Sequence, residues 1–232
     1  MPRFFLPDLS PGEIALPDEE AHHFAKVLRG RAGESVHVFD GRGRRAAAEV
    51  IAVAKRCVRV RVGEVTETPN RATVTLFVAA PKGDRFRWLV EKATELGVRA
   101  IQPIVTERTV TEPGGGKLDK LRQTSLAACK QCGRDWLMPI AEPIPLAEAV
   151  AGRITFAWAD RGGRSPLGEC EHDLFIGPEG GWSDDERVAL RSGGGGLPIA
   201  LGRHILRTET AAIAAAAICG GPESERLGDG DA

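Results

Sequence analysis

Hydrophobic and polar residues follow two different patterns along the 232-residue chain. Up to about residue 68, apolar positions alternate with polar ones, as they do in half-buried β-strands. The clearest case is "CVRVRVGEV" (57–65), in which valines share one face while Arg59 and Arg61 share the other. Residues 1–68 are therefore predicted to form a small β-rich domain with basic side chains along one face of its sheet.

Shorter patterns complete this first domain. "SVHVFDG" (35–41) and "RRAAAEVIAV" (44–53) predict two more strands, and the glycines of "GRGRR" between them predict a hairpin turn. "DEEAHHFAKVL" (18–28) predicts a short helix. Pro69 lies in a linker, "TETPNRA", where the domain is expected to end.

From Ala72 onward, apolar runs alternate with segments of helical periodicity. Strands that are apolar on both faces and separated by helices are typical of an open, largely parallel α/β sheet. Ligands of such sheets bind beyond the carboxyl ends of the strands, so the loops after Ile176 and Leu201 are the candidate functional edge. The expected strands are residues 72–80, 100–106, 154–160, 173–178 and 197–202, and the expected helices are residues 84–97, 117–132, 183–192 and 208–220.

Polar residues at the predicted helix starts indicate caps. Asp84 is expected to cap the helix at 84–97, and either Thr208 or Thr210 the alanine-rich last helix. Ser183 is followed three residues later by Glu186, which is the spacing of a capping box.

The chain contains five cysteines, an odd and small number for its length. This speaks against the disulfide framework of a secreted protein, and the cysteines are interpreted as reduced thiols. Cys129 and Cys132 form a C-x-x-C pair, but one pair supplies only two of the four ligands that structural zinc requires. The pair is interpreted as part of an ordinary helix, and no metal site is predicted.

Two observations bear on location. No apolar run reaches the roughly 18 residues of a membrane-spanning helix. The N-terminus, "MPRFFLPDLS", lacks the apolar core of a signal peptide. The expectation is a cytoplasmic protein without a membrane partner.

The net charge of −1 gives the whole chain no bulk attraction for nucleic acid, but the charges are unevenly distributed. Between Glu20 and Arg61, ten Lys or Arg residues stand against four acids. A basic surface of that size is able to neutralise several phosphates. Strands whose outward positions happen to be arginine would show the same excess, so charge alone does not decide between the two interpretations.

The loop "GPEGGWSDDE" (177–186) places three glycines within five positions and then a run of acids. Glycine permits backbone conformations closed to other residues and lets a ligand approach the main chain. A phosphate is disfavoured, because acids crowd the start of the following helix and the G-K-[ST] ending of a P-loop is missing. Two interpretations stay open: a simple tight turn, or a site where backbone groups hold a neutral or cationic ligand.

The second loop, within "ALGRHILRTET" (200–210), contains an apolar pair, Ile205 and Leu206, in an otherwise polar stretch. Apolar residues at the carboxyl end of a strand are able to form the wall of a pocket for a flat ring. A strand, a turn and a buried helix with nothing bound is the alternative. No G-x-G-x-x-G occurs in the sequence, so a Rossmann-type nucleotide site is not expected.

Five sequence blocks, in this order, resemble the ribosomal RNA small subunit methyltransferase E family. They are "HHFAKVLRGRAGESVHVFDG", "KGDRFRWLVEKATELGVRAIQPIVTERTV", "SLAACKQCGR", "FIGPEGGWSDDE" and "LGRHILRTETAA". The resemblance runs from about Arg3 to Cys219. Each block alone is a weak signal, whereas five in the right order are highly specific.

The resemblance implies an enzyme that uses S-adenosylmethionine to methylate N3 of a uridine of 16S ribosomal RNA, of the uridine 1498 type, and releases S-adenosylhomocysteine. It implies a PUA-like β-barrel over residues 1–68 that binds RNA, and a SPOUT α/β domain with a C-terminal trefoil knot over residues 72–221. It further implies a homodimer, with 16S ribosomal RNA or the small ribosomal subunit as partner. The acidic tail, 222–232, lies outside the match and is expected to be disordered.

The resemblance also assigns the two loops as the cofactor site, with the second loop around adenine and ribose. Arg207 is the candidate for stabilising negative charge on the uracil ring; pairing with Glu209 or with the cofactor carboxylate is the alternative. Glu209 is the candidate general base, provided that it reaches N3. The implied cofactor-binding residues are Ile176, Gly177, Pro178, Glu179, Gly180, Gly181, Leu201, Gly202, Ile205, Leu206 and Thr210.

Contacts to RNA are expected from both domains, although each of these cations is equally explained as a solvated surface charge. Many members of the family carry Arg just before the "ILR" segment, where this chain has His204 with Arg203 beside it. Whether Arg203 takes over that role stays open, and histidine would make it sensitive to pH. The candidate RNA-binding residues are Arg29, Arg31, Lys82, Arg85, Arg108, Lys130 and Arg134.

Two other functions compete with this hypothesis, and the first of them belongs to a different class. One is a catalytically silent RNA-binding or ribosome-assembly protein, which the basic sheet face would suit equally well. The other is a SPOUT methyltransferase that acts on another RNA, such as transfer RNA, or on a ribose hydroxyl. The intact "GPEGG" and "LRTETA" segments argue against the silent protein.

Overall fold

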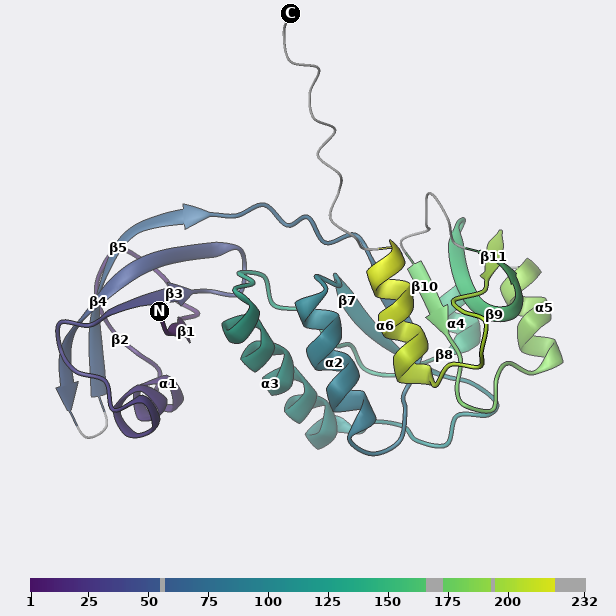
Figure 1. Ribbon diagram of the computed structural model, residues 1–232, viewed down its shortest axis with the longest axis horizontal. Coiled ribbons are helices and arrows are strands. Elements are labelled where there is room, and N and C mark those ends of the chain that lie inside the picture. Colours follow the sequence, from purple (N-terminus) through teal and green to yellow (C-terminus); the bar gives the residue numbers. More distant parts are fainter. Residues whose placement is uncertain (55–56, 166–172, 193–194, 220–232) are drawn as a thin grey trace, which may run out of the picture. The chain divides into compact units, whose positions relative to one another are not determined.

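The computed structural model describes residues 1–54, 57–165, 173–192 and 195–219. The chain forms two compact units (Figure 1). The first unit comprises Met1–Arg71 together with Leu126–Leu137, and the second comprises the remainder of the chain from Ala72. Each unit has its own hydrophobic core.

The first unit is built on a five-stranded sheet with the order β1-β3-β4-β5-β2. β1 pairs with β3 in parallel, and the other neighbours are antiparallel. β1 and β2 stand at the two ends of this order. The strands are β1 (Arg3–Phe5), β2 (Gly12–Ala15), β3 (Ser35–Phe39), β4 (Arg44–Ala54) and β5 (Cys57–Glu67).

The predicted alternation in β5 is confirmed, because its valines are buried and its arginines exposed. The outward arginines are partly neutralised. Glu13 of β2 pairs with Arg59 at 3.6 Å and with Arg61 at 3.0 Å. The outward face of β5 is therefore partly neutralised by Glu13 and is not a purely cationic surface.

The predicted helix at 18–28 is present in two parts, α1 (Asp18–His22) and a π-helical turn, η1 (His23–Leu28). Phe24 anchors the turn in the core, edge to face with Phe4 at a centroid distance of 5.7 Å. Arg29 ends the turn in the left-handed region, with φ of 54°.

Residues 126–137 extend the first unit although they lie far along the chain. They include the end of α3 (Gly115–Cys132), whose first residues belong to the second unit. The buried Asp135 accepts hydrogen bonds from Arg3 Nη2 at 2.6 Å and Thr68 Oγ1 at 3.0 Å. The expected N-terminal domain, 1–68, omits this segment, because only tertiary contacts reveal that it belongs there.

The second unit is a six-stranded sheet with the order β11-β9-β10-β6-β7-β8, in which every neighbouring pair is parallel. The prediction of an open, largely parallel α/β sheet is confirmed. The short β8 and α4 (Leu146–Val150) were not predicted. The strands are β6 (Thr75–Ala79), β7 (Ala100–Val105), β8 (Ile144–Pro145), β9 (Phe156–Arg164), β10 (Asp173–Ile176) and β11 (Gly196–Ile199).

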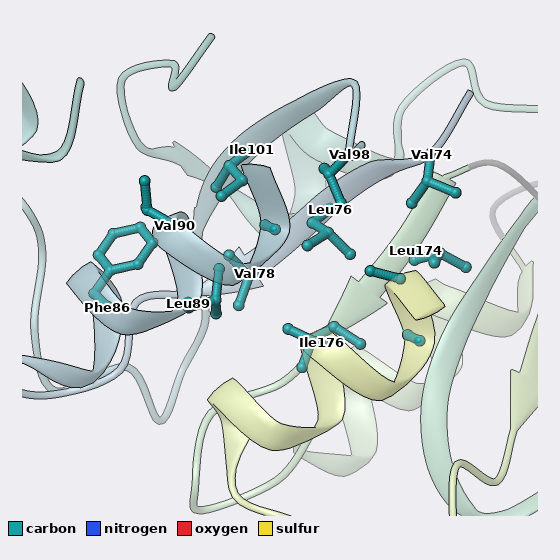
Figure 2. Close-up of a cluster of buried hydrophobic side chains, with 14 of the residues drawn as sticks. Val74, Leu76, Val78, Phe86, Leu89, Val90, Val98, Ile101, Leu174 and Ile176 are labelled. Atoms are coloured by element: carbon teal, nitrogen blue, oxygen red, sulfur yellow. The ribbon is translucent and has the colours of Figure 1, made fainter. Parts of the chain in front are cut away.

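Helices cover both faces of this sheet, as a sheet apolar on both faces requires. α2 (Arg85–Glu95), α6 (Thr208–Cys219) and the start of α3 pack on one face, where Leu76 and Val78 of β6 meet them (Figure 2). α4 and α5 (Asp184–Ser192) pack on the other. There Phe77 of β6 stacks on Phe175 of β10 at a centroid distance of 4.4 Å.

The predicted helix caps have mixed outcomes. The capping box is confirmed: Ser183 N donates to Glu186 Oε2 at 2.8 Å, and Glu186 N donates to Ser183 Oγ at 3.3 Å. Asp84 precedes α2 but makes no side-chain cap, so that prediction is wrong. Thr208 is the first residue of α6, and its hydroxyl donates to the Gly177 carbonyl at 3.0 Å instead of capping the helix.

Cys129 and Cys132 lie on α3, as predicted, and both are reduced, as is Cys57. Cys219 is disulfide-bonded, so the interpretation of all cysteines as reduced is wrong at this position. Cys170 lies outside the described residues. Among the residues that the structure describes, no group of three or more His, Cys, Asp or Glu is arranged to hold a metal ion.

None of the helices formed by the described residues has the length and apolar character needed to cross a membrane.

Candidate functional site

The two predicted loops meet in the second unit and enclose a cavity of about 240 Å³. It lies beyond the carboxyl ends of β10 and β11, with residues 159–161 of β9 along one side. Of the predicted cofactor-binding residues, only Gly180 and Thr210 do not line it. Those that do are Ile176, Gly177, Pro178, Glu179, Gly181, Leu201, Gly202, Ile205 and Leu206.

The three glycines of the first loop differ in what a side chain at their position would meet. A Cβ on Gly177 would lie 2.9 Å from Trp182 Cε2, so the indole ring requires a bare backbone there. Gly181 has φ of +69°, which L side chains rarely adopt. A Cβ on Gly180 would lie 3.3 Å from Arg108 Cβ, away from the cavity. The prediction that Gly180 lines the ligand site is therefore not supported by the geometry.

Internal contacts hold this loop in place. Trp182 Nε1 donates to the Ala159 carbonyl at 2.9 Å, and Thr208 Oγ1 donates to the Gly177 carbonyl at 3.0 Å. Gly181 N donates to the Pro178 carbonyl at 2.8 Å, which closes a turn. The loop is thus both a tight turn and a pocket wall, and the two interpretations of its glycines are compatible.

The lining of the cavity has an apolar part and a charged part. Leu201, Ile205 and Leu206 supply apolar side chains from the second loop. Asp160 and Arg187 form an ion pair at 2.6 Å on another part of the lining. A flat uncharged ring fits against the apolar side chains, and charged groups of a ligand would meet Asp160, Glu179 or Arg187.

Several lining residues were not predicted from the sequence. The strand "ITFAWAD" was predicted, but nothing in a single sequence shows that its residues reach the cavity. Trp182 follows the glycines directly, and a large ring beside bare backbone is a signal that was available. The additional lining residues are Ala159, Asp160, Arg161, Trp182, Arg187, Ile199, Ala200, His204, Thr208 and Ala211.

A charged cluster of Arg85, Glu179 and Glu209 joins the first turn of α2 to the pocket. Arg85 Nη1 lies 3.7 Å from Glu179 Oε1, and Arg85 Nε lies 3.7 Å from Glu209 Oε1. Glu209 is 7% exposed, and its Oε2 has no hydrogen-bond partner among the described residues. A buried carboxylate oxygen without a donor is costly. Glu209 is not among the residues that line the cavity.

The second catalytic candidate, Arg207, is exposed at the start of α6. Its side chain makes no hydrogen bond or ion pair with the residues that the structure describes. The alternative in which Arg207 pairs with Glu209 is wrong, because the ion-pair partner of Glu209 is Arg85. Arg207 is thus available to a ligand or substrate.

Residues 106–109 are hydrogen-bonded to the first loop and the helix start that follows it. We call this first loop, residues 177–186, the glycine loop. Arg108 Nη1 donates to the Gly180 carbonyl at 2.8 Å. Glu186 accepts from Glu107 N at 2.8 Å through Oε1, while its Oε2 takes part in the capping box. One carboxylate therefore caps a helix and also positions the loop that carries Arg108.

The predicted RNA-binding residues fall into two groups. Arg29, Arg31 and Lys82 are exposed, and their side chains make no ion pair within the described residues. Arg85 and Arg108 are engaged as described above.

The remaining two candidates, Lys130 and Arg134, are bound into the first unit. Lys130 Nζ pairs with the buried Glu20 at 2.8 Å. Burial lowers the pKa of the Arg134 guanidinium, and its carbonyl accepts a hydrogen bond from Arg3. These contacts favour a structural role for both residues.

Comparison with known proteins identifies the family. A model described as an RNA methyltransferase PUA domain matches residues 16–63, and one described as an RNA methyltransferase domain matches residues 66–220. The ribosomal RNA small subunit methyltransferase E of Synechocystis is 35% identical over an alignment of 219 residues, and the match covers 88% of this chain and 71% of the relative. The chain belongs to the ribosomal RNA small subunit methyltransferase E family.

Solved structures of similar methyltransferases have the same fold. A methyltransferase E from Neisseria gonorrhoeae, bound to S-adenosylmethionine, is 32% identical, with a TM-score of 0.85 over 94% of this chain and 95% of the other. A methyltransferase from Legionella pneumophila, in complex with the same cofactor, is 34% identical, with a TM-score of 0.83 over 94% and 96%. The family expected from the sequence blocks is confirmed, as is a mixed α/β fold with a PUA domain and a methyltransferase domain.

Proposed function

We propose that this protein transfers a methyl group from S-adenosylmethionine to N3 of a uridine in 16S ribosomal RNA, of the uridine 1498 type. The observation that carries the proposal is the cavity between the two loops, in a chain of the methyltransferase E family. The cavity supplies the surroundings that this cofactor needs.

The residues present fit S-adenosylmethionine. Gly177 and Gly181 leave the backbone bare, and Leu201, Ile205 and Leu206 offer apolar walls to an adenine ring. The Glu179 carboxylate suits a sulfonium cation, and Arg187 suits a carboxylate. When bound, the cofactor supplies the methyl group as an electrophile.

The chain's own residues then act on the uracil. N3 must lose a proton before it is nucleophilic, and Glu209 Oε2 is a buried acceptor with no protein donor among the described residues. Arg85 orients the Glu209 side chain through its contact with Oε1. Arg207 is free to stabilise the negative charge that develops on the uracil ring.

The finer features of the fold belong to this proposal. The family resemblance supports closure of the first sheet into a PUA-like barrel and a trefoil knot formed by the two loops and α6. It also supports domains at residues 1–68 and 72–221, apart from residues 126–137, which pack in the first unit. The tail, 222–232, lies outside the described residues. We propose that the enzyme acts in the cytoplasm on 16S ribosomal RNA or the small subunit.

A homodimer is also part of the proposal. Exposed apolar side chains on the mutually packed helices α2 and α6, and at the residue directly after α2, support it, because exposed apolar groups mark interaction surfaces. These side chains are Trp88, Leu96 and Ile218.

Two measurements test the function. Isothermal titration calorimetry with purified protein should detect binding of S-adenosylmethionine. Mass spectrometry of 16S ribosomal RNA from a deletion strain should then show loss of one base methyl group, restored by the parent gene. Cofactor binding without a missing mark on 16S RNA would favour an enzyme acting on another RNA, and absence of both would favour the catalytically silent RNA-binding protein.

A further inference from the structure

The C-x-x-C pair of α3 combines one exposed thiol with one buried thiol. Cys132, the last residue of α3, is exposed, and Cys129, about one turn earlier, is fully buried. Residues three apart in a helix are neighbours on one face, so the exposed sulfur has a second sulfur beside it. An accessible thiol next to a second thiol that is able to displace its adduct is the arrangement of redox-sensing cysteines.

A guanidinium lies near both thiols. Burial, the larger effect, lowers the pKa of Arg134, whereas negative charge on Cys129 and on Cys132 raises it. The three groups are therefore within electrostatic reach of one another. A cation beside a pair of thiols favours the anionic sulfur that attacks a disulfide.

The helix end is a place where the backbone is able to adjust. Side chains three apart in a helix have Cβ atoms about 5–6 Å apart, whereas a disulfide requires about 3.8 Å, so the last turn must tighten by about 2 Å. Gly133 follows Cys132 directly and has φ of +87°. Because α3 ends there, no further helical turn resists the change.

The buried thiol also contacts the segment that follows the helix. Cys129 Sγ donates to the Trp136 carbonyl at 3.5 Å, and the Trp136 indole Nε1 donates to the Thr68 carbonyl at 2.8 Å. A disulfide has no S–H group to donate. Oxidation of Cys129 therefore removes the first of these two hydrogen bonds and moves the helix end that precedes Trp136.

The same segment is bonded to the turn between β3 and β4. Gly43 N donates to the Asp135 carbonyl at 3.1 Å, and Leu137 N donates to the Gly41 carbonyl at 2.9 Å. A Cβ on Gly43 would lie 2.5 Å from Trp136 Cε2, so the indole packs directly on the backbone. These contacts belong to the first unit and depend on where α3 ends.

We propose that Cys129 and Cys132 are a redox-active dithiol, which a low-molecular-weight disulfide oxidises to an intramolecular disulfide that loosens residues 133–137 from the rest of the first unit. The Cys132 sulfur attacks one sulfur of the small disulfide, whose S–S bond breaks and releases one thiol. The Cys129 sulfur then attacks Cys132 and displaces the second thiol. The two protein thiols give their protons to the departing thiolates, so one small disulfide is reduced to two thiols as one protein disulfide forms.

The test uses the full-length protein and oxidised glutathione. Trypsin cleaves after Lys130, between the two cysteines, so a disulfide would join peptide 123–130 to peptide 131–134. Remaining thiols are blocked with N-ethylmaleimide before digestion. Mass spectrometry should show the joined pair, two hydrogens lighter than the sum of the peptides, and dithiothreitol should abolish it.

Cys57 is the internal control, because it is exposed but has no second cysteine three or four residues away. It should stop at the mixed disulfide with glutathione. In Cys129→Ser, Cys132 should stop at the same adduct, and in Cys132→Ser the buried Cys129 should stay unmodified. A glutathione adduct that persists on Cys132 of the parent would overturn the proposal, as would the absence of joined peptides in excess oxidised glutathione.

Hydrogen exchange measured by NMR tests the loosening. The amide protons of Gly43 and Leu137 should exchange about two- to tenfold faster in the oxidised protein, the change expected when about one hydrogen bond is lost. The Val98 amide, which donates to the Ala93 carbonyl in the second unit, should be unaffected. Equal protection of Gly43 and Leu137 in both oxidation states would show that the disulfide does not loosen the segment.

None of these measurements involves the cofactor or RNA. The two cysteines belong to the first unit and the cavity to the second. A parent protein that binds no S-adenosylmethionine would contradict the proposed function and leave the dithiol test intact, whereas failure of the dithiol test would leave the proposed function unaffected.

Discussion

At the scale of single residues, the buried carboxylate of Glu209 is the most informative group. Its Oε1 faces Arg85, whereas its Oε2 has no donor among the described residues. Such an atom is costly in a protein without a ligand and useful in one that must accept a proton.

Glu209→Gln should therefore lower kcat for RNA methylation by about 100-fold or more, which is the range of general-base catalysis. The amide retains the shape of the side chain but does not accept the N3 proton. Single-turnover kinetics measure the effect, and calorimetry should show unchanged cofactor affinity. A variant with normal kcat would exclude Glu209 as the base.

Arg85→Lys and Arg85→Gln extend the same test. If Arg85 positions Glu209, lysine should restore much of the kcat that glutamine loses, because it keeps the positive charge near Oε1. A role in binding RNA phosphates would instead raise KM. The split between kcat and KM decides between these two roles.

The glycine loop offers a matched pair at this scale. Gly177→Ala should weaken S-adenosylmethionine binding at least tenfold, because the new methyl group would lie 2.9 Å from Trp182 Cε2 and displace a wall of the cavity. Overpacking of this kind costs about 1–3 kcal/mol. Gly180→Ala adds the same methyl group outside the lining and should bind within about threefold of the parent. Equal losses in both variants would contradict this placement of the cavity.

At the scale of elements, one side chain connects a helix to a neighbouring loop. Glu186 completes the capping box of α5 and accepts the Glu107 backbone N–H, which holds residues 106–109 against the glycine loop. Glu186→Ala should lower the free energy of unfolding by about 1 kcal/mol or more, from the lost cap. It should also raise KM for RNA if Arg108 contacts RNA.

Asp185→Ala is the control for that prediction. It removes one negative charge from the same helix turn, but Asp185 is exposed and accepts no hydrogen bond from the described residues. Thermal denaturation and RNA kinetics of the two variants should therefore differ. If they are equivalent, the hydrogen bonds of Glu186 contribute nothing beyond its charge.

The β3–β4 hairpin carries a pH-dependent contribution to stability. Burial raises the pKa of Asp40, but hydrogen bonds from the Arg44 side chain and from the backbone N–H groups of Arg42 and Arg44 outweigh it, so the pKa is lowered overall. A lowered folded-state pKa stabilises the protein above the unfolded value of about 3.9, and this contribution is lost as pH falls through the folded pKa.

Stability measured by thermal denaturation should therefore decrease below about pH 4 more steeply in the parent than in Asp40→Asn. The variant has no carboxylate to protonate at that site. Parallel curves for the two proteins would show that Asp40 does not contribute to the acid sensitivity.

At the scale of the whole molecule, the regular elements were predictable because their signals are local. A few consecutive residues are enough to recognise β5 from its alternating valines and β6 from its apolar run. β8 has two residues and α4 has five, too short for a period to appear. The site was predictable as two loops at one sheet edge. Asp160 of β9 and Arg187 of α5 were not predictable, because only the tertiary fold brings them to the cavity.

The composition of the first unit was not predictable for the same reason. Asp135 is buried against Arg3 and Thr68, which lie 132 and 67 positions away in the sequence. A polypeptide of residues 1–71 should therefore unfold at a lower temperature than one in which a flexible linker joins residues 1–71 to 126–137. Circular dichroism measures both, and equal midpoints would mean that the late segment is dispensable.

The late segment of the first unit also affects how this protein is made. The ribosome completes residues 1–71 first but must add residues 72–137, a further 66, before the last part of that unit exists. At roughly 5–20 residues per second this takes about 3–13 s. During that interval the N-terminal sheet lacks Asp135, the partner of Arg3 and Thr68. The first unit of the nascent chain therefore cannot complete its folding until residues 126–137 have been synthesised.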